Sequence, residues 1–156
     1  MLKLSFLEII LRTIPENLLF VLVPYVISTK EIKGYEYVKS VFILSLSVVI
    51  IRVFPISYGV HTLLNLILLV ILLNSINHIE IGLAIKSVIV TTILLLISEG
   101  INLLGLNIII GSIPKKMLIN PLNRIIMGMP SIIIFGILLF LLFKINKRKK
   151  QYEYNW

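Results

Sequence analysis

The segment Ile67-Leu68-Leu69-Val70-Ile71-Leu72-Leu73 is aliphatic at every position. A strand of a membrane β-barrel alternates apolar with polar residues, so this segment does not fit a barrel. On a helix it is apolar on every face, which is typical of a helix surrounded by lipid. Similar apolar runs recur along almost the whole chain of 156 residues. Because a helix needs about 20 apolar residues to cross the hydrocarbon layer, we expect an all-α, polytopic bundle of transmembrane helices.

The composition agrees with a chain that uses lipid as its solvent. Hydrophobic residues make up 58% and charged residues only 14%, whereas a soluble domain is about a quarter charged. The chain contains no cysteine and no aspartate, which excludes disulfides, thiolate metal sites and catalytic pairs of aspartates. With two histidines and no nucleophile, base and orienting group that can be named together, the sequence predicts neither an enzyme nor a metal or cofactor site.

The apolar runs and their interruptions predict about five helices. Pro55 ends the second run, because proline removes a backbone donor and disfavours a helical conformation at the preceding residue. Residues 105–123 are expected to form a loop with an interfacial or re-entrant turn, although a full crossing by 103–113 would give six spans. The five expected helices cover residues 4–28, 38–53, 58–75, 81–104 and 121–144.

The distribution of positive charge predicts the topology. The chain divides into one transmembrane domain, residues 1–146, and a short basic tail, residues 147–156. Five of the fifteen Lys and Arg residues lie between Lys144 and Lys150, so the positive-inside rule predicts a cytoplasmic tail and a multi-pass protein of the cell membrane. With five spans the amino terminus would face outward. The positive residues gather in gaps and in the tail rather than on a folded basic face, so we expect no nucleic-acid partner.

Ionisable residues inside the first apolar run form the first candidate site. Glu8, Arg12 and Glu16 are four residues apart and would form one stripe on a helix, in which Arg12 can bridge both carboxylates. One interpretation is structural: Thr13-x-x-Glu16 is a capping box that follows an amphipathic segment at the membrane interface. The other interpretation is functional: Arg12 and Glu16 line a polar site for a ligand or partner.

Three further residues are expected at one depth. Arg52 lies at the end of the second helix, His61 near the start of the third, where it shares a face with Asn65, and Glu99 late in the fourth. With the amino terminus outside, all three lie toward the outer surface. Glu99 is either exposed at the interface or paired with Arg52 or Arg12. We expect Arg52, His61 and Glu99 to form one polar cluster, which with Arg12 and Glu16 completes the candidate site.

Four short motifs carry a resemblance to a known group. They are Thr13-Ile14-Pro15-Glu16, Arg52-Val53-Phe54-Pro55-Ile56-Ser57-Tyr58-Gly59-Val60-His61, Glu99, and Asn120-Pro121-Leu122-Asn123-Arg124. In these motifs the chain resembles small membrane domains of low-GC Gram-positive bacteria, which are similar to the membrane input halves of sporulation-type and accessory-gene-regulator-type sensor histidine kinases. The chain ends about six residues after its basic run, so no kinase domain is expected to follow.

The resemblance implies a non-catalytic sensing or accessory module in the membrane that acts through a partner. The expected partners are the lipid bilayer and another membrane or cytoplasmic protein, or a second copy of this chain. The intramembrane charges keep an alternative open, in which the protein is a small transporter or channel subunit whose Arg12, Arg52, His61 and Glu99 line a pathway.

Overall fold

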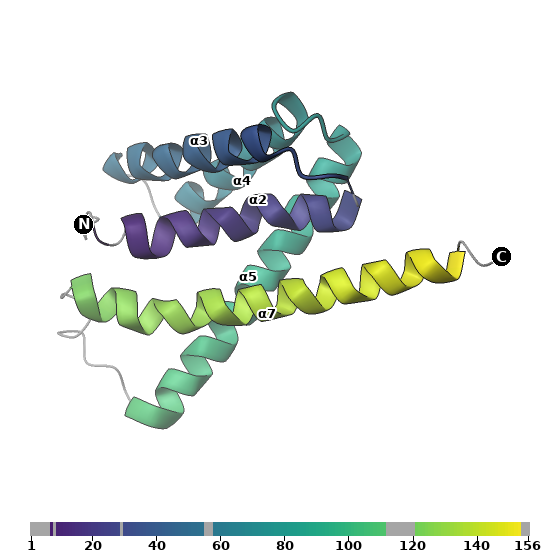
Figure 1. Ribbon diagram of the computed structural model, residues 1–156. Coiled ribbons are helices and arrows are strands. Elements are labelled where there is room, and N and C mark those ends of the chain that lie inside the picture. The colour runs from purple at the N-terminus through teal and green to yellow at the C-terminus, as the bar shows by residue number, and fades with distance from the viewer. Residues whose placement is uncertain (1–6, 8, 29, 55–57, 112–120, 154–156) are drawn as a thin grey trace.

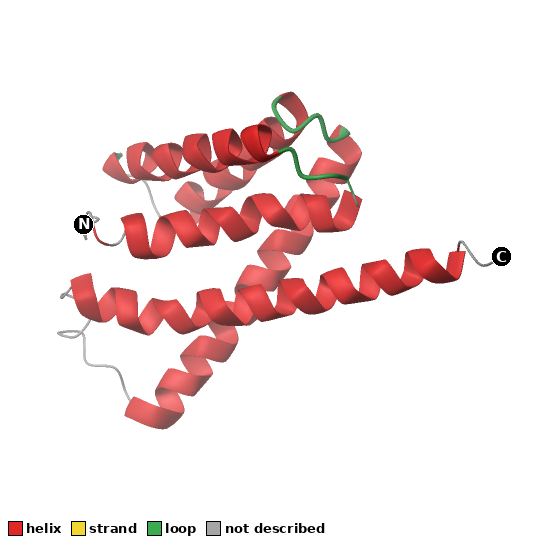
Figure 2. Cartoon of the chain, viewed as in Figure 1, coloured by secondary structure: helices red, strands yellow, loops and turns green. Residues whose placement is uncertain are grey.

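All secondary structure in the described part of the chain is helical (Figure 2). The computed structural model describes residues 7, 9–28, 30–54, 58–111 and 121–153, without the side chains of 52, 53, 58, 59, 110, 121, 124 and 149–153. The elements are the π-helical turn η1 (Ile9–Thr13) and the α-helices α2 (Ile14–Ser28), α3 (Gly34–Val53), α4 (Tyr58–Ser75), α5 (Ile81–Ile110) and α7 (Pro121–Glu153). The expected all-α bundle of about five helices is confirmed.

Four of these helices are long and apolar enough to cross a membrane. The spanning segments are Ile9–Ser28, Gly34–Ile51, Ile81–Ile109 and Ile125–Arg148, and α4 contains a shorter apolar segment, Val60–Ser75. Large aliphatic side chains remain exposed along every helix; Ile108, for example, is 85% exposed. Exposed apolar surface on this scale is stable in lipid rather than in water. Together these features indicate a membrane protein.

The helices run up and down between two ends of the bundle (Figure 1). The Arg12 end contains the beginnings of α2 and α4 and the end of α3, and the Asn77 end contains the loop 76–80 between α4 and α5.

Two amide side chains fix the direction of α7. Asn102 donates to the Met127 carbonyl at 2.8 Å near its start, and Asn146 donates to the Val26 carbonyl at 3.2 Å near its end. The helix α7 is therefore antiparallel to α5 and runs in the same direction as α2.

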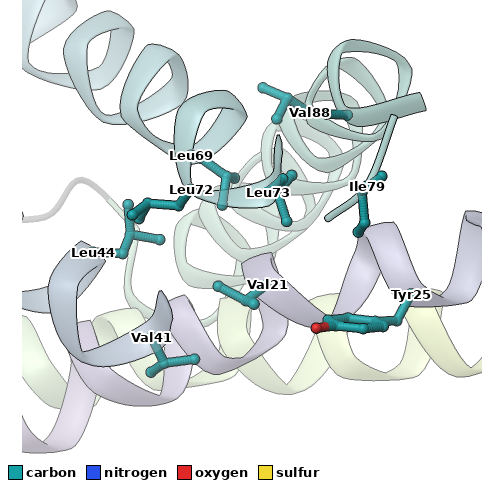
Figure 3. Packing of buried hydrophobic residues seen from close by; sticks show 10 residues of the cluster. Val21, Tyr25, Val41, Leu44, Leu69, Leu72, Leu73, Ile79 and Val88 are labelled. Carbon is teal, nitrogen blue, oxygen red and sulfur yellow. The ribbon is translucent and has the colours of Figure 1, made fainter. Parts of the chain in front are cut away.

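The main apolar core lies among α2, α3, α4 and α5 (Figure 3). Val21 of α2, Leu44 of α3 and the α4 residues Leu69 and Leu73 have at most 1% of their surface exposed. A smaller cluster joins α7 to α2 and α5 through Val23, Leu94, Phe135 and Leu139. Because all these groups are aliphatic or aromatic, helix association relies on close van der Waals packing and not on exclusion of water.

Small side chains allow α5 to pack closely against its neighbours. Ala84, Ser87, Thr91 and Ser98 recur every three to seven residues and are each 0% exposed. The three hydroxyls are satisfied within the helix, since each donates to the carbonyl four residues earlier at 2.6 to 2.8 Å. This face therefore presents neither bulk nor an unpaired polar group to the packed helices, as is common at membrane helix interfaces.

The side chain and backbone of Asn77 hold the elements of this end of the bundle together. Its side chain is 0% exposed, donates to the Tyr25 hydroxyl at 2.6 Å and accepts from the Ser40 hydroxyl. Its backbone carbonyl accepts from the Lys30 ammonium group at 3.3 Å, which also donates to the His78 carbonyl at 2.6 Å. His78 turns the chain with a positive φ of 51°. One asparagine thus links α2, α3 and the loop that leads into α5.

Several expected helix ends differ from the structure. The helix α3 begins at Gly34 and not at the expected 38, so residues 34–37 extend it by about one turn. The expected end of the fourth helix at Leu104 is wrong because α5 continues to Ile110. The expected loop with its turn at 105–123 is therefore helical at 105–110 and at 121–123, and its middle part, 112–120, lies outside the described residues. The helix α7 begins at Pro121 as expected but runs past Lys144 to Glu153. The expected bounds 58–75 of α4 are confirmed.

Candidate functional site: a polar pocket at the Arg12 end

A polar pocket of about 380 Å³ lies at the Arg12 end, among α2, α3, α4 and α5. Among the described residues, its wall carries one cation and two carboxylates, together with amide and hydroxyl groups, next to aliphatic and aromatic side chains. The volume is within the range of about 300–1,000 Å³ that is typical of small-molecule sites. The lining residues are Arg12, Thr13, Glu16, Asn17, Phe20, Leu44, Val48, Thr62, Asn65, Leu66, Thr92, Leu95, Leu96 and Glu99.

Arg12 and Glu99 bring opposite charges together across the pocket. The guanidinium Nη2 atom of Arg12 lies 4.0 Å from the Glu99 Oε1 atom. The two side chains are 35% and 43% exposed, so both keep surface that faces the pocket rather than being sealed in the core. Arg12 lies in the π-helical turn η1, which widens the helix before α2 begins. The pair therefore holds the start of the first helix against α5 and leaves both charges available to a ligand.

Gly128 of α7 makes room for the guanidinium group. A Cβ atom at Gly128 would lie 3.0 Å from Cζ, 3.1 Å from Nη1 and 3.2 Å from Nε of Arg12. Contacts this short require Arg12 to shift, so the absence of a side chain at 128 sets the position of the charge. Arg12 thus contacts both α5, through Glu99, and α7, through Gly128.

Amide and hydroxyl groups complete the wall. Asn17 is 3% exposed and donates to the Ser45 hydroxyl at 3.0 Å, which fixes α2 against α3. Thr92 donates to the Val88 carbonyl of its own helix at 2.8 Å. The Oδ1 atom of Asn65 is buried, and no donor among the described residues bonds to it. An unpartnered amide oxygen at the wall of a pocket is an acceptor for a ligand donor or a water molecule.

The structure brings together three of the five candidate residues predicted from the sequence. Arg12, Glu16 and Glu99 line one pocket. His61 lies one helical turn before Asn65, and the Nδ1 atom of its ring is buried. The side chain of Arg52 lies outside the described residues, so the expected cluster of Arg52, His61 and Glu99 stays a prediction. Of the two partners expected for Glu99, the structure places Arg12 beside it.

The helix bounds argue against the capping-box interpretation of Thr13 and Glu16. A capping residue begins a helix from a non-helical conformation. Thr13 is instead the last residue of the helical turn η1, and α2 continues directly from it. Glu16 is consequently a residue of a continuous helix that faces a pocket, which favours the polar-lining interpretation.

Sequence reasoning missed Asn17, Thr62, Thr92 and Gly128 as parts of this site. Asn17 and Thr62 each stand next to a residue that was singled out, Glu16 and His61, and this adjacency is the signal that the sequence offers. Gly128 has no such signal, because its role depends on the distance between α7 and Arg12.

Comparison with known proteins gives no match to a family model, to a curated protein or to a solved structure.

We expect the Arg12–Glu99 pair to contribute to stability. Replacing either residue by glutamine removes one charge, and the double variant removes both. Since the pair is partly exposed and 4.0 Å apart, we expect a coupling free energy of about 1 kcal/mol, at the upper limit for surface pairs and below that of buried pairs. The unfolding free energies of the wild type, the two single variants and the double variant, measured in mixed micelles, form a double-mutant cycle that gives this coupling free energy.

A second pair provides the control for this cycle. Lys33 and Glu36 are 3.2 Å apart at the start of α3, and Lys33 is 66% exposed. Their coupling should be about 0.3 kcal/mol, as for other exposed pairs within one helix. A coupling for Arg12 and Glu99 no larger than this value would contradict a structural role for their contact.

Proposed function

We propose that this protein is a non-catalytic sensing or accessory module of the cell membrane. It binds a small polar ligand in the pocket at the Arg12 end and acts through a partner protein. The observation that carries the proposal is that this pocket gathers Arg12, Glu16 and Glu99 next to the apolar core of the bundle. Charges in a membrane domain are costly and are kept where they have a function.

Apolar residues bound the pocket toward the Asn77 end. Phe20, Leu44 and Leu66 line it, and along α4 the residue Leu66 is followed by the core residues Leu69 and Leu73, which Figure 3 shows packed with Leu44. The polar lining therefore stops about halfway through the bundle. A blind pocket of this kind suits reception of a ligand from one side better than conduction from one side to the other.

The lining charges favour a particular class of ligand. Arg12 contributes one positive charge, and Glu16 and Glu99 contribute two negative charges. Because carboxylates outnumber cations among the described lining residues, the site favours a ligand with an ammonium or guanidinium group. An anionic or amide group on the same ligand could accept a hydrogen bond from the Arg12 guanidinium group, and a hydrogen-bond donor on the ligand could bind the Asn65 oxygen.

Charge and resemblance support the orientation and the mode of action. The basic run near the end of α7 favours the cytoplasm for the Asn77 end, which places the pocket in the outer half of the membrane. The resemblance to membrane input domains of sensor kinases supports a sensing role, in which a signal leaves through a second protein. The helix α7 connects the pocket to the side from which the signal leaves, since it contacts Arg12 at Gly128 and carries the basic run.

The alternative function is a small transporter or channel subunit. The pairing of Arg12 with Glu99 at membrane depth is the observation that favours it, because ion pathways contain such pairs. The two functions differ in a measurable way. Proteoliposomes with the purified chain alone should show no ion flux above empty vesicles if it is a sensing module, whereas flux abolished by Glu99→Gln would overturn the proposal.

We expect the pocket to be accessible to water from the outer surface. The chain contains no cysteine, so a thiol introduced at Thr92 would be the only one present. In intact cells a membrane-impermeant maleimide should label Thr92→Cys at least about tenfold faster than Ile93→Cys, because a thiol ionises in water and stays protonated in an apolar environment. Thr92 lines the pocket, and its neighbour Ile93 is 50% exposed on the surrounding surface.

The labelling experiment also tests the orientation. Equal rates at the two positions would contradict a water-filled pocket, and labelling of Thr92→Cys only after the cells are opened would place the pocket on the cytoplasmic side. A ligand with an ammonium group that occupies the pocket should protect Thr92→Cys from the reagent; arginine and lysine methyl esters are suitable probes.

A further inference from the structure

An apolar groove separates α2 from α7 at the Asn77 end, away from the polar pocket. It has a volume of about 620 Å³. The residues that form its bed come from both helices and are almost all aliphatic or aromatic, and the polar ones lie toward one end. The lining residues are Leu19, Leu22, Tyr25, Val26, Lys30, Ile32, Gly136, Leu139, Phe140, Phe143, Asn146 and Lys147.

The polar end of the groove carries two positive charges. Lys30 follows the end of α2, and Lys147 lies on α7 beside Asn146. The hydrogen bond from the Asn146 amide to the Val26 carbonyl ties the helices together at this level. Lys30 lines the groove, and its ammonium group donates to the carbonyls of Asn77 and His78, which fixes this side chain against the loop 76–80 next to the groove. No carboxylate is among the lining residues in the described part of the chain.

Gly136 keeps the groove open. A Cβ atom built at this position would meet no atom within 4 Å. The space next to α7 is therefore not filled by another side chain of the described residues. Its two walls are joined below by the cluster of Val23, Leu94, Phe135 and Leu139, so the groove does not close by moving α7 inward without repacking that cluster.

We propose that this groove binds an anionic phospholipid. One acyl chain lies in the apolar bed, and the phosphate headgroup lies at the mouth between Lys30 and Lys147. This combination of an apolar cleft with a basic mouth between membrane helices is suited to anionic lipids of the inner leaflet. The two lysines with no carboxylate among the described lining residues favour an anionic headgroup, and the aliphatic and aromatic bed favours an acyl chain. The inference goes beyond the proposed function and does not depend on the ligand of the polar pocket.

Native mass spectrometry of the full chain in mild detergent tests the proposal. Phosphatidylglycerol and phosphatidylcholine with the same acyl chains are the two probes. The wild-type chain should bind phosphatidylglycerol about thirtyfold more tightly, because each of the two lysines near the headgroup contributes about 1 kcal/mol, or about fivefold. Lys147→Gln should lower the affinity for phosphatidylglycerol about fivefold and leave phosphatidylcholine unchanged. Gly136→Leu should weaken both lipids alike because its side chain fills the bed.

Matched substitutions elsewhere serve as controls. Lys86→Gln removes an exposed charge near the same end of the bundle, and Gly105→Leu adds the same side chain to α5 where a Cβ also meets no atom within 4 Å. Neither should change lipid binding. Phe143→Ala is a second variant of the bed at a position that is 47% exposed, so that the test does not depend on the folding of Gly136→Leu.

The outcomes that would overturn the proposal are distinct. Equal affinity for the two lipids would exclude recognition of the headgroup. Unchanged lipid binding in both Gly136→Leu and Phe143→Ala would exclude the apolar bed as the binding site of the acyl chain. An equal loss in Lys86→Gln and Lys147→Gln would indicate general attraction to positive charge, and displacement by soluble glycerol phosphate would indicate a site for free phosphate.

Discussion

Asn77→Ala should destabilise the protein by about 2–4 kcal/mol. The substitution leaves the Tyr25 and Ser40 hydroxyls without the partner that each has in the wild type. An unsatisfied buried polar group costs about 1–3 kcal/mol, and the low dielectric of the protein interior around Asn77 keeps the cost near that range. The free energy of unfolding in mixed micelles, followed by helical circular dichroism, measures the effect.

Asn107→Ala is the control for this prediction. Asn107 is also an asparagine at the edge of the membrane part, but its side chain is exposed near the end of α5. The same chemical change there should cost less than about 0.5 kcal/mol. Equal effects of the two substitutions would contradict the role of Asn77 as the link between α2, α3 and the loop before α5.

Ser87→Leu should destabilise the bundle by about 2–3 kcal/mol. Ser87 is 0% exposed on the small-residue face of α5, so a leucine side chain can enter only by pushing a neighbouring helix away or by adopting a strained rotamer. Its greater hydrophobicity brings no compensation, because lipid and protein interior are similarly apolar. The same unfolding measurement should show the loss, together with earlier separation of α5 in cysteine crosslinking.

Ser87→Ala separates the size of the side chain from its polarity. The Ser87 hydroxyl donates only to the Leu83 carbonyl of its own helix at 2.6 Å among the contacts described for it. Removing it should therefore change stability by less than about 1 kcal/mol. A large loss in Ser87→Ala would show that the hydroxyl rather than the volume of the side chain matters at this position.

The sequence was informative about the number of helices and about the ends marked by proline or by polar runs. The bounds of α4 followed from Pro55 before it and from the polar residues after Leu73. The predicted end of α5 at Leu104, next to Gly105, is six residues too early. In lipid a helix retains its backbone hydrogen bonds for lack of any alternative, so glycine interrupts it less than in water.

The candidate site was predictable in its residues and not in its contacts. Arg12, Glu16 and Glu99 stand out because ionisable groups in apolar helices are rare. Which faces meet could not be predicted, because α5 is apolar nearly all round and its sequence carries little information about which side is packed. The contact of Arg12 with Gly128 depends on how closely α7 approaches η1, which no local pattern encodes.

The length of α5 makes the bundle responsive to hydrophobic mismatch. Its apolar segment, Ile81–Ile109, extends for about 43 Å, whereas the hydrocarbon layer is about 30 Å thick. The helix fits only when tilted, and Figure 1 shows it crossing α2 and α7 obliquely. A thicker bilayer favours a more upright α5 and a thinner one a flatter α5. Because Glu99 and Asn102 connect this helix to Arg12 and α7, we expect a change in bilayer thickness to alter the geometry of the polar pocket.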